Sequence, residues 1–516
     1  MVLKWIGMGK VDHPMGDAEE ARQLVGALSA ENSAKALEEA TYWLESLNRT
    51  KGFKLGQRFD NVDLLDGAVK NHLRKLSQDY LSMPRQQKFQ ENMLWKGIHG
   101  FWKELGDAYI QCVDQYEGGA SGATAIKKNL AVIVARAMRT LTLQLKWNLL
   151  RYGPIEPRIW VDLARLYRIA GSKGFSEGTI IIYPGPHGDG SVKGEFLKAM
   201  MLSASCADGL PPVRQEIAER LVAQFADTFR LSDQPEGCTH CFDLAAPKAP
   251  ARLYKGAAPT ASMRFFGAAG GVVALERLIA QIRDTGSVPA DVNLGGTHDN
   301  EIVIGVVRHL IQYWSETPPA RGSERRQTAG RITVVPGLNQ VLEALEPAQD
   351  DELDFSREQP AESWIVENVS DGGYGAIIPT VKSDWIKVGT LVGVQSETSN
   401  YWGIGLIRRI AHDEHQQRRV GIQVLSRTAI PVKIARNLPT TVAPDADREA
   451  QPAVLLSTAP DAQGEVAVVM RVGLFSRKDS LDMKVRDKTY LLMPSRFVEG
   501  GDDFDWAKFK VMQRGA

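Results

Sequence analysis

The sequence predicts a multidomain α+β protein in which a helical N-terminal half is followed by an antiparallel β-barrel and a C-terminal β unit. Three observations carry this prediction. The chain has 516 residues, which is too many for one ordinary hydrophobic core. Apolar residues recur with a helical period over residues 1–230, and short β-like runs separated by turns follow from residue 321.

The helical half is predicted from amphipathic segments with short breaks between them. One face of a helix is marked between Ala36 and Leu47, a second long segment spans residues 127–151, and a third begins after the prolines at 211 and 212. No clean repeat period is present, so the segments predict a helix bundle or an α-solenoid without assigning a repeat family.

Residues 231–320 are expected to form a mixed connecting region. Short β-like pieces (CFDL, ARLY and MRFF) precede two helical segments, GGVVALERLIAQIRD and NEIVIGVVRHLIQYWSE. The paired prolines at 318 and 319 then end this region.

Strand-like runs at short spacing predict an antiparallel sheet or small barrel over residues 321–437. Within it, residues 346–362 are acidic and polar and are expected to form a flexible insertion. Residues 438–452 have the composition of a linker, and residues 452–516 are expected to form a second small β unit or an extension of the first.

The overall composition bounds the function. Lys plus Arg and Asp plus Glu each number 62, and a net charge of zero argues against a protein that coats nucleic acid. The N-terminus lacks the apolar core of a signal peptide, and no apolar run is long enough to predict a membrane span. Four cysteines are too few for a disulfide scaffold, so a soluble cytoplasmic protein is expected.

A cluster of arginines directly precedes the first strand-like run. Arg321, Arg325, Arg326 and Arg331 lie within RGSERRQTAGR, and only Glu324 offsets them. The planar guanidinium fork suits phosphate oxygens and the guanine edge. A solvated basic linker is the alternative interpretation, because short basic runs are common.

A second feature is the stretch WIVENVSDGGYG, a strand that turns and starts again. Asn368 and Ser370 are two residues apart, so both side chains project from one face of an extended strand. The glycines that follow permit a close approach of a ligand to the backbone. The alternative is an Asx or Ser turn that satisfies only its own backbone.

Taken together, the basic arm and the Asn-x-Ser-x-x-Gly turn resemble the PilZ domain family, over about residues 321–435. PilZ domains are small β-barrels that bind cyclic di-GMP with an Arg-x-x-x-Arg arm and a downstream Asp/Asn-x-Ser-x-x-Gly turn. The layout resembles that of large multidomain PilZ proteins of proteobacteria. The resemblance implies a cyclic di-GMP effector that is not an enzyme and needs no cofactor. The ligand-binding residues would be Arg321, Arg325, Arg326, Arg331, Asn368, Ser370 and Gly373.

The arginine spacing departs from the family pattern. The pair with three intervening residues, Arg321 and Arg325, lies six or more residues before Ile332, where the first strand is expected. The closer pair, Arg326 and Arg331, has four intervening residues. A scaffold with a degenerate barrel that binds no nucleotide is therefore the alternative function. In either case the helical half is expected to supply the surface for an unidentified protein partner.

Three further features have structural interpretations that we prefer. The GCTHC segment, with Cys238 and Cys241, is half of a zinc site without a second pair at ligand spacing. Residues 184–195 are Gly-rich but lack the spacing of a phosphate loop. The THDNE segment with His298 is expected to cap the following helix rather than to catalyse a reaction.

Overall fold

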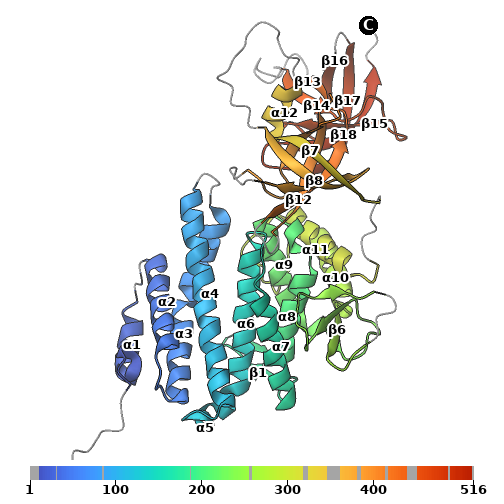
Figure 1. The fold of residues 1–516 in the computed structure, drawn as a ribbon. Coiled ribbons are helices and arrows are strands. Elements are labelled where there is room, and N and C mark those ends of the chain that lie inside the picture. The colour runs from blue at the N-terminus through green and yellow to red at the C-terminus, as the bar shows by residue number, and fades with distance from the viewer. Residues whose placement is uncertain are drawn as a thin grey trace, which may run out of the picture. The chain divides into compact units, whose positions relative to one another are not determined.

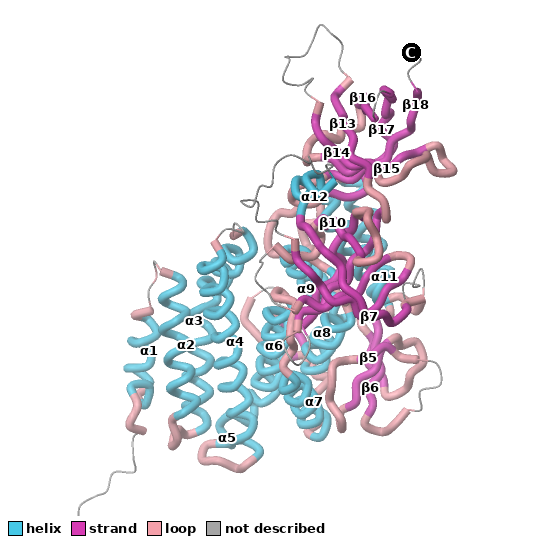
Figure 2. The backbone as a smooth tube through the Cα atoms, turned by 45° about the horizontal axis from the view of Figure 1, so that its top comes forward, coloured by secondary structure: helices cyan, strands magenta, loops and turns pink. Residues whose placement is uncertain are grey.

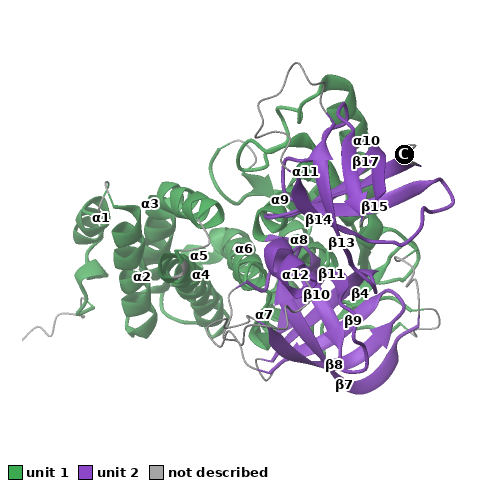
Figure 3. Ribbon diagram, turned by 90° about the horizontal axis from the view of Figure 1, so that it is seen from above, with its two compact units in different colours: residues 1–207, 212–319 green, residues 208–211, 320–516 purple. Residues whose placement is uncertain are grey.

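The computed structural model divides the chain into two compact units, which consist of residues 1–207 with 212–319 and residues 208–211 with 320–516 (Figure 3). The residues that the structure describes are 11–28, 30, 32–83, 87–185, 188–254, 259–317, 324–345, 361–379, 385–412, 417–437, 450–485 and 488–513. Among them, no helix is long and apolar enough to cross a membrane.

The first unit is built mainly from helices that lie side by side (Figures 1 and 2). Polar residues begin several of them: Asp17 and Asn32 accept backbone N–H groups at the starts of the first two. The main helices are α1 (Ala18–Gly26), α2 (Ser33–Arg49), α3 (Leu55–Ser82), α4 (Lys88–Glu117), α6 (Leu130–Leu149), α7 (Pro157–Ser172), α8 (Val192–Ala204) and α9 (Pro212–Gln224). Short elements between them are α5 (Ala123–Ile126), β1 (Ile180–Ile181) and β2 (Asp189–Gly190).

The mixed region expected over residues 231–320 shares the core of the helical region. Its sheet has the order β3-β6-β4-β5, and α11 packs against α9. Buried Trp314 of α11 meets the ring of Phe229 edge-on at 5.3 Å, and its Nε1 donates to Ser205 Oγ at 3.2 Å. Residue 230 is therefore not a boundary between cores. The elements are β3 (Arg230–Ser232), β4 (His240–Asp243), β5 (Ala251–Arg252), β6 (Met263–Gly267), α10 (Gly270–Thr285) and α11 (Asn300–Trp314).

The second unit contains two closed antiparallel barrels, so the predicted α+β class is confirmed. The first barrel has the strand order β10-β11-β12-β9-β8-β7. Its elements are β7 (Arg326–Pro336), α12 (Gly337–Leu345), β8 (Glu362–Ser370), β9 (Gly373–Ile378), β10 (Leu391–Ser396), β11 (Gly403–His412) and β12 (Arg418–Ser426). The acidic insertion expected at residues 346–362 lies outside the described residues up to residue 360.

One end of the first barrel is closed by two tryptophans. Trp364 is fully buried, and its ring stacks on that of Trp385 with centroids 5.6 Å apart. Both indole N–H groups donate to the same carboxylate, that of Glu362, at 2.8 and 3.0 Å. Stacked indoles with satisfied N–H groups, of which Trp364 is buried and Trp385 half-buried, fill this end of the barrel.

The second barrel has the strand order β13-β14-β15-β18-β17-β16. Strand β13, which we expected in the first barrel because that domain was predicted to end at residue 437, pairs instead with β14 and β16. The linker expected at residues 438–452 lies outside the described residues except for 450–452, where β14 already begins. The strands are β13 (Ile430–Arg436), β14 (Gln451–Leu455), β15 (Glu465–Met470), β16 (Leu481–Val485), β17 (Lys488–Gly500) and β18 (Asp505–Gln513).

The two barrels share a hydrophobic core, in which α12 lies between them. Leu338 and Val341 of α12 pack with Leu406 of the first barrel and with Val454 and Phe504 of the second. A continuous core of this kind makes two elements cooperative. A movement of one barrel is therefore transmitted to the other.

A buried ion cluster stabilises the first unit. The Glu195 carboxylate is 1% exposed and accepts from Arg139 through two bonds, at 2.6 and 3.1 Å, and from Lys198 Nζ at 2.9 Å. Burial alone would raise the pKa of Glu195, but the two cations outweigh it and lower the pKa to about 2. The folded state therefore holds this carboxylate ionised.

Replacing Glu195 with Gln should lower the free energy of unfolding of the first unit by about 3–5 kcal/mol, because two cations lose their buried partner. The native contribution is complete above the ordinary pKa of 4.5 and is lost as the pH falls toward 2, where the carboxylate takes up a proton. Denaturant unfolding followed by far-ultraviolet circular dichroism across this range measures both effects.

The matched control is Glu177→Gln, which removes an exposed partner of Lys193. We expect that variant to change the free energy of unfolding by less than about 1 kcal/mol. Equal effects of the two substitutions would mean that the Glu195 cluster does not stabilise the fold.

Candidate functional site

A β-bulge in strand β8 decides which way its polar residues face. Trp364 and Val366 are buried inside the barrel. Val366 pairs with Ala376, but the next paired residue is Asn368, which pairs with Gly375, so Glu367 is an extra residue. Regular alternation would turn Asn368 inward after Val366. The bulge turns Asn368 and Ser370 to the outer surface instead, and Val369 to the interior.

Asn368 lies directly over a glycine of the neighbouring strand. A side chain at Gly375 would place its Cβ 2.7 Å from both the Oδ1 and the Nδ2 atoms of Asn368. Gly375 in turn pairs with Gly421 of β12, and Gly421 pairs with Arg409 of β11. The outer surface therefore has a floor of two adjacent glycines, with the Asn368 amide at one end and Arg409, whose Nε donates to Asp208 Oδ2, next to the other.

Gly373 is required by a close approach of two strands. A Cβ on Gly373 would lie 1.9 Å from the backbone oxygen of Ile422, a distance that no side chain can accommodate. Its φ is not in the left-handed region, so a positive φ is not the reason for this glycine. The turn is further fixed to β12 because Val424 N donates to Gly372 O at 2.9 Å.

The four predicted arginines do not lie together. Arg321 falls outside the described residues. Arg326 pairs with Val369, and exposed Arg325 lies one residue before this first pair, at the end of β8 that carries Ser370. The side chain of Arg326 projects to the same side of the sheet as that of its partner Val369. Arg331 is further along the strand, where it pairs with Ile365 and its Nη1 donates to Ser363 Oγ at 3.2 Å.

Strand β7 begins earlier than the sequence analysis predicted, so the arginines lie closer to the first strand than expected. Strand β7 starts at Arg326, not at Ile332. Arg325 therefore directly precedes the strand, as the family pattern requires of its arginine arm. The structure brings together Arg325, Asn368, Ser370 and Gly373, and leaves Arg326 and Arg331 on other parts of the barrel.

Two polar side chains of this surface, those of Asn368 and Ser370, have hydrogen-bonding groups that no described residue uses. The side chains of Asn368 and Ser370 make no hydrogen bond to any residue that the structure describes, although both are half-buried. An Asn amide offers a donor and an acceptor in one plane, which matches the edge of a nucleobase. The surface can therefore bind a planar polar ring and, through Arg325, an anion.

The sequence analysis missed residues on β9, β11 and β12 that complete this surface. Gly375 and Gly421 form its floor, and Arg409 of β11 lies on its far side. Arg419 of β12 extends back toward β8, with its Nη2 3.5 Å from Glu367 Oε1. The available signal was a glycine inside each of two strand-like runs, YGAII and RRVGIQV, since such a glycine often marks a close approach.

The GCTHC segment has the features of a structural element. His240 is buried and stacks on Phe266, and burial followed by the nearby Arg252 lowers its pKa to about 4. Burial also raises the pKa of both Cys238 and Cys241, which disfavours the thiolate that binds metals. No group of His, Cys, Asp and Glu with metal-binding geometry occurs among the described residues.

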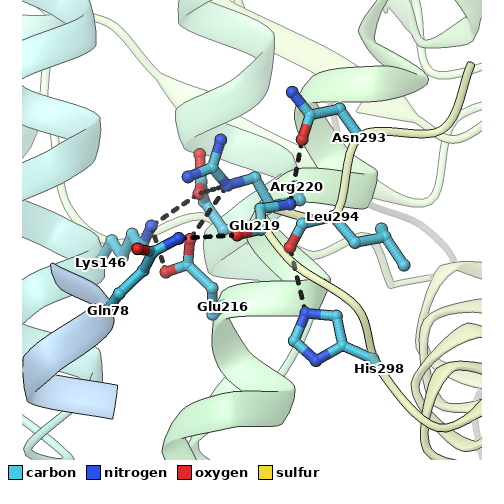
Figure 4. Close-up of polar contacts among 9 residues, drawn as sticks. Gln78, Lys146, Glu216, Glu219, Arg220, Asn293, Leu294 and His298 are labelled. Carbon is cyan, nitrogen blue, oxygen red and sulfur yellow. Dashed lines mark hydrogen bonds and ion pairs between the residues drawn. The ribbon is translucent and has the colours of Figure 1, made fainter. Parts of the chain in front are cut away.

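The THDNE and Gly-rich segments also have structural roles. Asp299 accepts from Glu301 N and Ile302 N and so caps α11. His298 Nε2 contacts Leu294 O at 3.2 Å, and Gln78 Nε2 donates to Gly295 O of the same loop at 3.4 Å (Figure 4). In the Gly-rich segment, Ser191 caps α8 by accepting from Gly194 N at 3.0 Å.

Comparison with known families matches two parts of the chain. Residues 19–236 match the model described as "Cyclic-di-GMP receptor FimW, N-terminal domain", and residues 340–431 match "Cyclic-di-GMP receptor FimW, middle PilZ domain". The second range includes Asn368, Ser370 and Gly373 and begins after Arg331. The resemblance to PilZ domains is thus confirmed. No curated protein matches the chain.

Replacing Gly373 with Ala should destabilise the first barrel by about 1–3 kcal/mol or more, because the new methyl group forces β9 away from the Ile422 carbonyl. Gly330→Ala is the matched control, since an added Cβ there meets nothing within 4 Å and its φ is ordinary. Thermal unfolding of each full-length variant, followed by circular dichroism, measures the difference. Equal melting curves for the two variants would contradict the close approach.

Proposed function

The chain is a PilZ-containing multidomain protein, and we propose that it is a receptor that binds cyclic di-GMP on the outer surface of its first barrel. The family models that it matches describe a cyclic di-GMP receptor, which is a binding protein rather than an enzyme. In this proposal the protein breaks no bond and needs no cofactor. It responds to the nucleotide by altering its contacts with another protein.

The observation that carries the proposal is the amide of Asn368, held over Gly375 with its hydrogen-bonding groups directed to no described residue. A guanine base has donors and acceptors along one planar edge, so Asn368 and Ser370 can satisfy it. The glycine floor lets the base lie against the backbone. Arg325, which lies at the end of β8 that carries Ser370, supplies a donor fork for a phosphate.

The alternative is a scaffold whose barrel binds no nucleotide. Side chains alternate along a strand, so Arg325 is expected to project to the same outer surface as Asn368 and Ser370. This shared direction supports the receptor instead. A degenerate site has no reason to keep a side-chain-free floor between two strands where valine or isoleucine would pack better.

We propose that the signal reaches the second barrel through a chain of polar contacts. Gly373 of the turn pairs with Gln423 of β12, and Gln423 Oε1 accepts from Arg408 Nε at 2.7 Å. The guanidinium of Arg408 then forms two parallel bonds, at 2.6 and 2.8 Å, with the carboxylate of Glu499 on β17. A paired fork of this kind fixes orientation as well as distance.

We also propose that the helical unit binds a protein partner. It is matched by its own family model, separately from the barrel. Several of its large apolar side chains are exposed, among them Tyr42 at 60%, Phe89 at 78% and Met93 at 56%. Exposed aromatic and methionine side chains are typical of interaction surfaces.

Isothermal calorimetry should detect binding of cyclic di-GMP to the full chain, and Arg325→Ala should weaken it by roughly 10- to 150-fold, the effect of losing a charged hydrogen-bond partner. The Asn368→Ala, Ser370→Ala double variant should likewise lose affinity while its barrel unfolds cooperatively. Arg326→Ala should have a smaller effect than Arg325→Ala, because Arg326 shares the side of Val369.

The matched control is Arg331→Ala, which removes the same charge from the same strand at a position opposite Ile365. We expect its affinity to stay within about twofold of the native value, since charge alone contributes little at an exposed site. Equal losses in Arg325→Ala and Arg331→Ala would indicate non-specific attraction, and absence of any binding would favour the scaffold.

The polar relay predicts that cyclic di-GMP slows amide hydrogen exchange in β17 and β18. Glu499→Gln should keep the nucleotide affinity within a few fold but abolish this change, because Arg408 loses its charged partner. Asp461→Asn, which removes a Lys508 ion pair within the second barrel, should leave the change intact. An unaltered exchange response in Glu499→Gln would exclude this route.

A further inference from the structure

The end of the first barrel that faces away from the stacked tryptophans is open. A cavity of about 450 Å³ enters the barrel there, a volume within the range of small-molecule sites. Its walls are mixed and come from several strands. Val366, Val369, Tyr374, Ile404 and Val424 supply apolar surface, and serine, threonine and charged side chains supply the rest. Val369, Tyr374 and Val424 are only half-buried, so the cavity exposes apolar surface that the protein itself does not cover.

The rim of this cavity is polar, and two arginines, Arg427 and Arg331, line it. The Nη2 of Arg427 donates to the backbone oxygens of Ser370 and Asp371 at 3.3 Å each. The Nη1 of Arg331 donates to Ser363 Oγ at 3.2 Å. Glu397, on another part of the rim, accepts from Arg331 N at 3.3 Å.

We propose that this mouth is a second ligand site, and that it takes a small amphipathic anion with an apolar body and a single carboxylate. The apolar body would lie between Val369, Tyr374 and Val424, where it removes exposed hydrocarbon from water. The carboxylate would lie at the rim beside Arg427, whose guanidinium has donors beyond the Nη2 group that holds the turn. Small closed barrels hold single ligands in this way.

The bulge in β8 keeps this site separate from the cyclic di-GMP surface. Val369 faces the cavity, and Asn368 and Ser370 on either side of it face outward. The two sites are nevertheless joined by Arg427, which contacts the backbone of the turn that carries Ser370. A carboxylate that draws Arg427 away from this turn would change the nucleotide affinity, and by linkage the nucleotide would change the affinity for the carboxylate equally.

The test uses the full chain and two probes, the fluorescent anion anilinonaphthalene sulfonate and octanoate, with octanol as the uncharged counterpart. The native protein should bind the fluorescent anion at one site, and octanoate should displace it. Val369→Phe and Val424→Phe each fill the cavity and should each weaken both probes by tenfold or more. Ile365→Phe, an enlargement of an exposed residue on the outer side of the same strand, is the matched control and should leave binding unchanged.

The head group is tested separately with Arg427→Gln. This variant should weaken octanoate by about tenfold, the loss expected for a charged hydrogen bond, and leave octanol unchanged. A near-ultraviolet circular dichroism spectrum like that of the native protein shows that a variant is folded. If only one of the two cavity-filling variants folds, that variant is sufficient for the test.

Three results would overturn the proposal. Native-like octanoate binding in both folded cavity-filling variants would exclude the mouth as the site. Equal weakening by Ile365→Phe would mean that the probe adheres to the surface. Mutually exclusive binding of octanoate and cyclic di-GMP, with Val369→Phe abolishing both, would make the cavity part of the nucleotide site. Because nucleotide binding is measured independently with Asn368→Ala, failure here leaves the receptor proposal standing.

Discussion

The single extra residue in strand β8 is the constraint on which the chemistry of the first barrel depends. Side chains alternate along a strand, so Trp364 and Val366 fix the inward side. Without the bulge at Glu367, Asn368 and Ser370 would be buried in an apolar barrel, where unsatisfied amides and hydroxyls are costly. With it, the same residues lie on the outer surface, and Val369 opens toward the cavity. A second bulge in β11, at Arg408, produces the side chain that reaches Glu499.

The shared core of the second unit determines what a ligand on this surface can influence. The hydrophobic contacts around α12 join the two barrels, and Asp503 of the second barrel accepts from Leu338 N at 2.7 Å. Gly337 precedes this contact with φ +76, and a side chain there would meet the Asp503 carboxylate at 2.7 Å. Since closely packed cores transmit displacement rather than absorb it, the barrels respond together. The C-terminal barrel is thus packed as one unit with the first barrel.

Much of the architecture could be predicted from the sequence, because it depends on local patterns. Helical periodicity and short strand runs gave the α+β class, and Asn368, Ser370 and Gly373 carried the resemblance to PilZ domains. The residues that complete the surface could not be predicted, because they depend on pairing between distant strands. Gly375 lies beneath Asn368 only through the β8–β9 register, and strand β13 belongs to the second barrel only through its partners β14 and β16.

The start of the first strand shows how local composition can misplace an element boundary. The run RITVV suggested a strand start at Ile332, because β-branched residues cluster there, and this placed Arg325 too far upstream. Strand β7 in fact begins at Arg326, in a polar stretch that pairs with the site-bearing end of β8. That extension follows from the length of β8 and not from the composition of β7. Two arginines four residues apart in an extended arm face the same side, since side chains alternate. Arg326 and Arg331, which are five apart, do not satisfy this condition, and Arg321 lies outside the described residues.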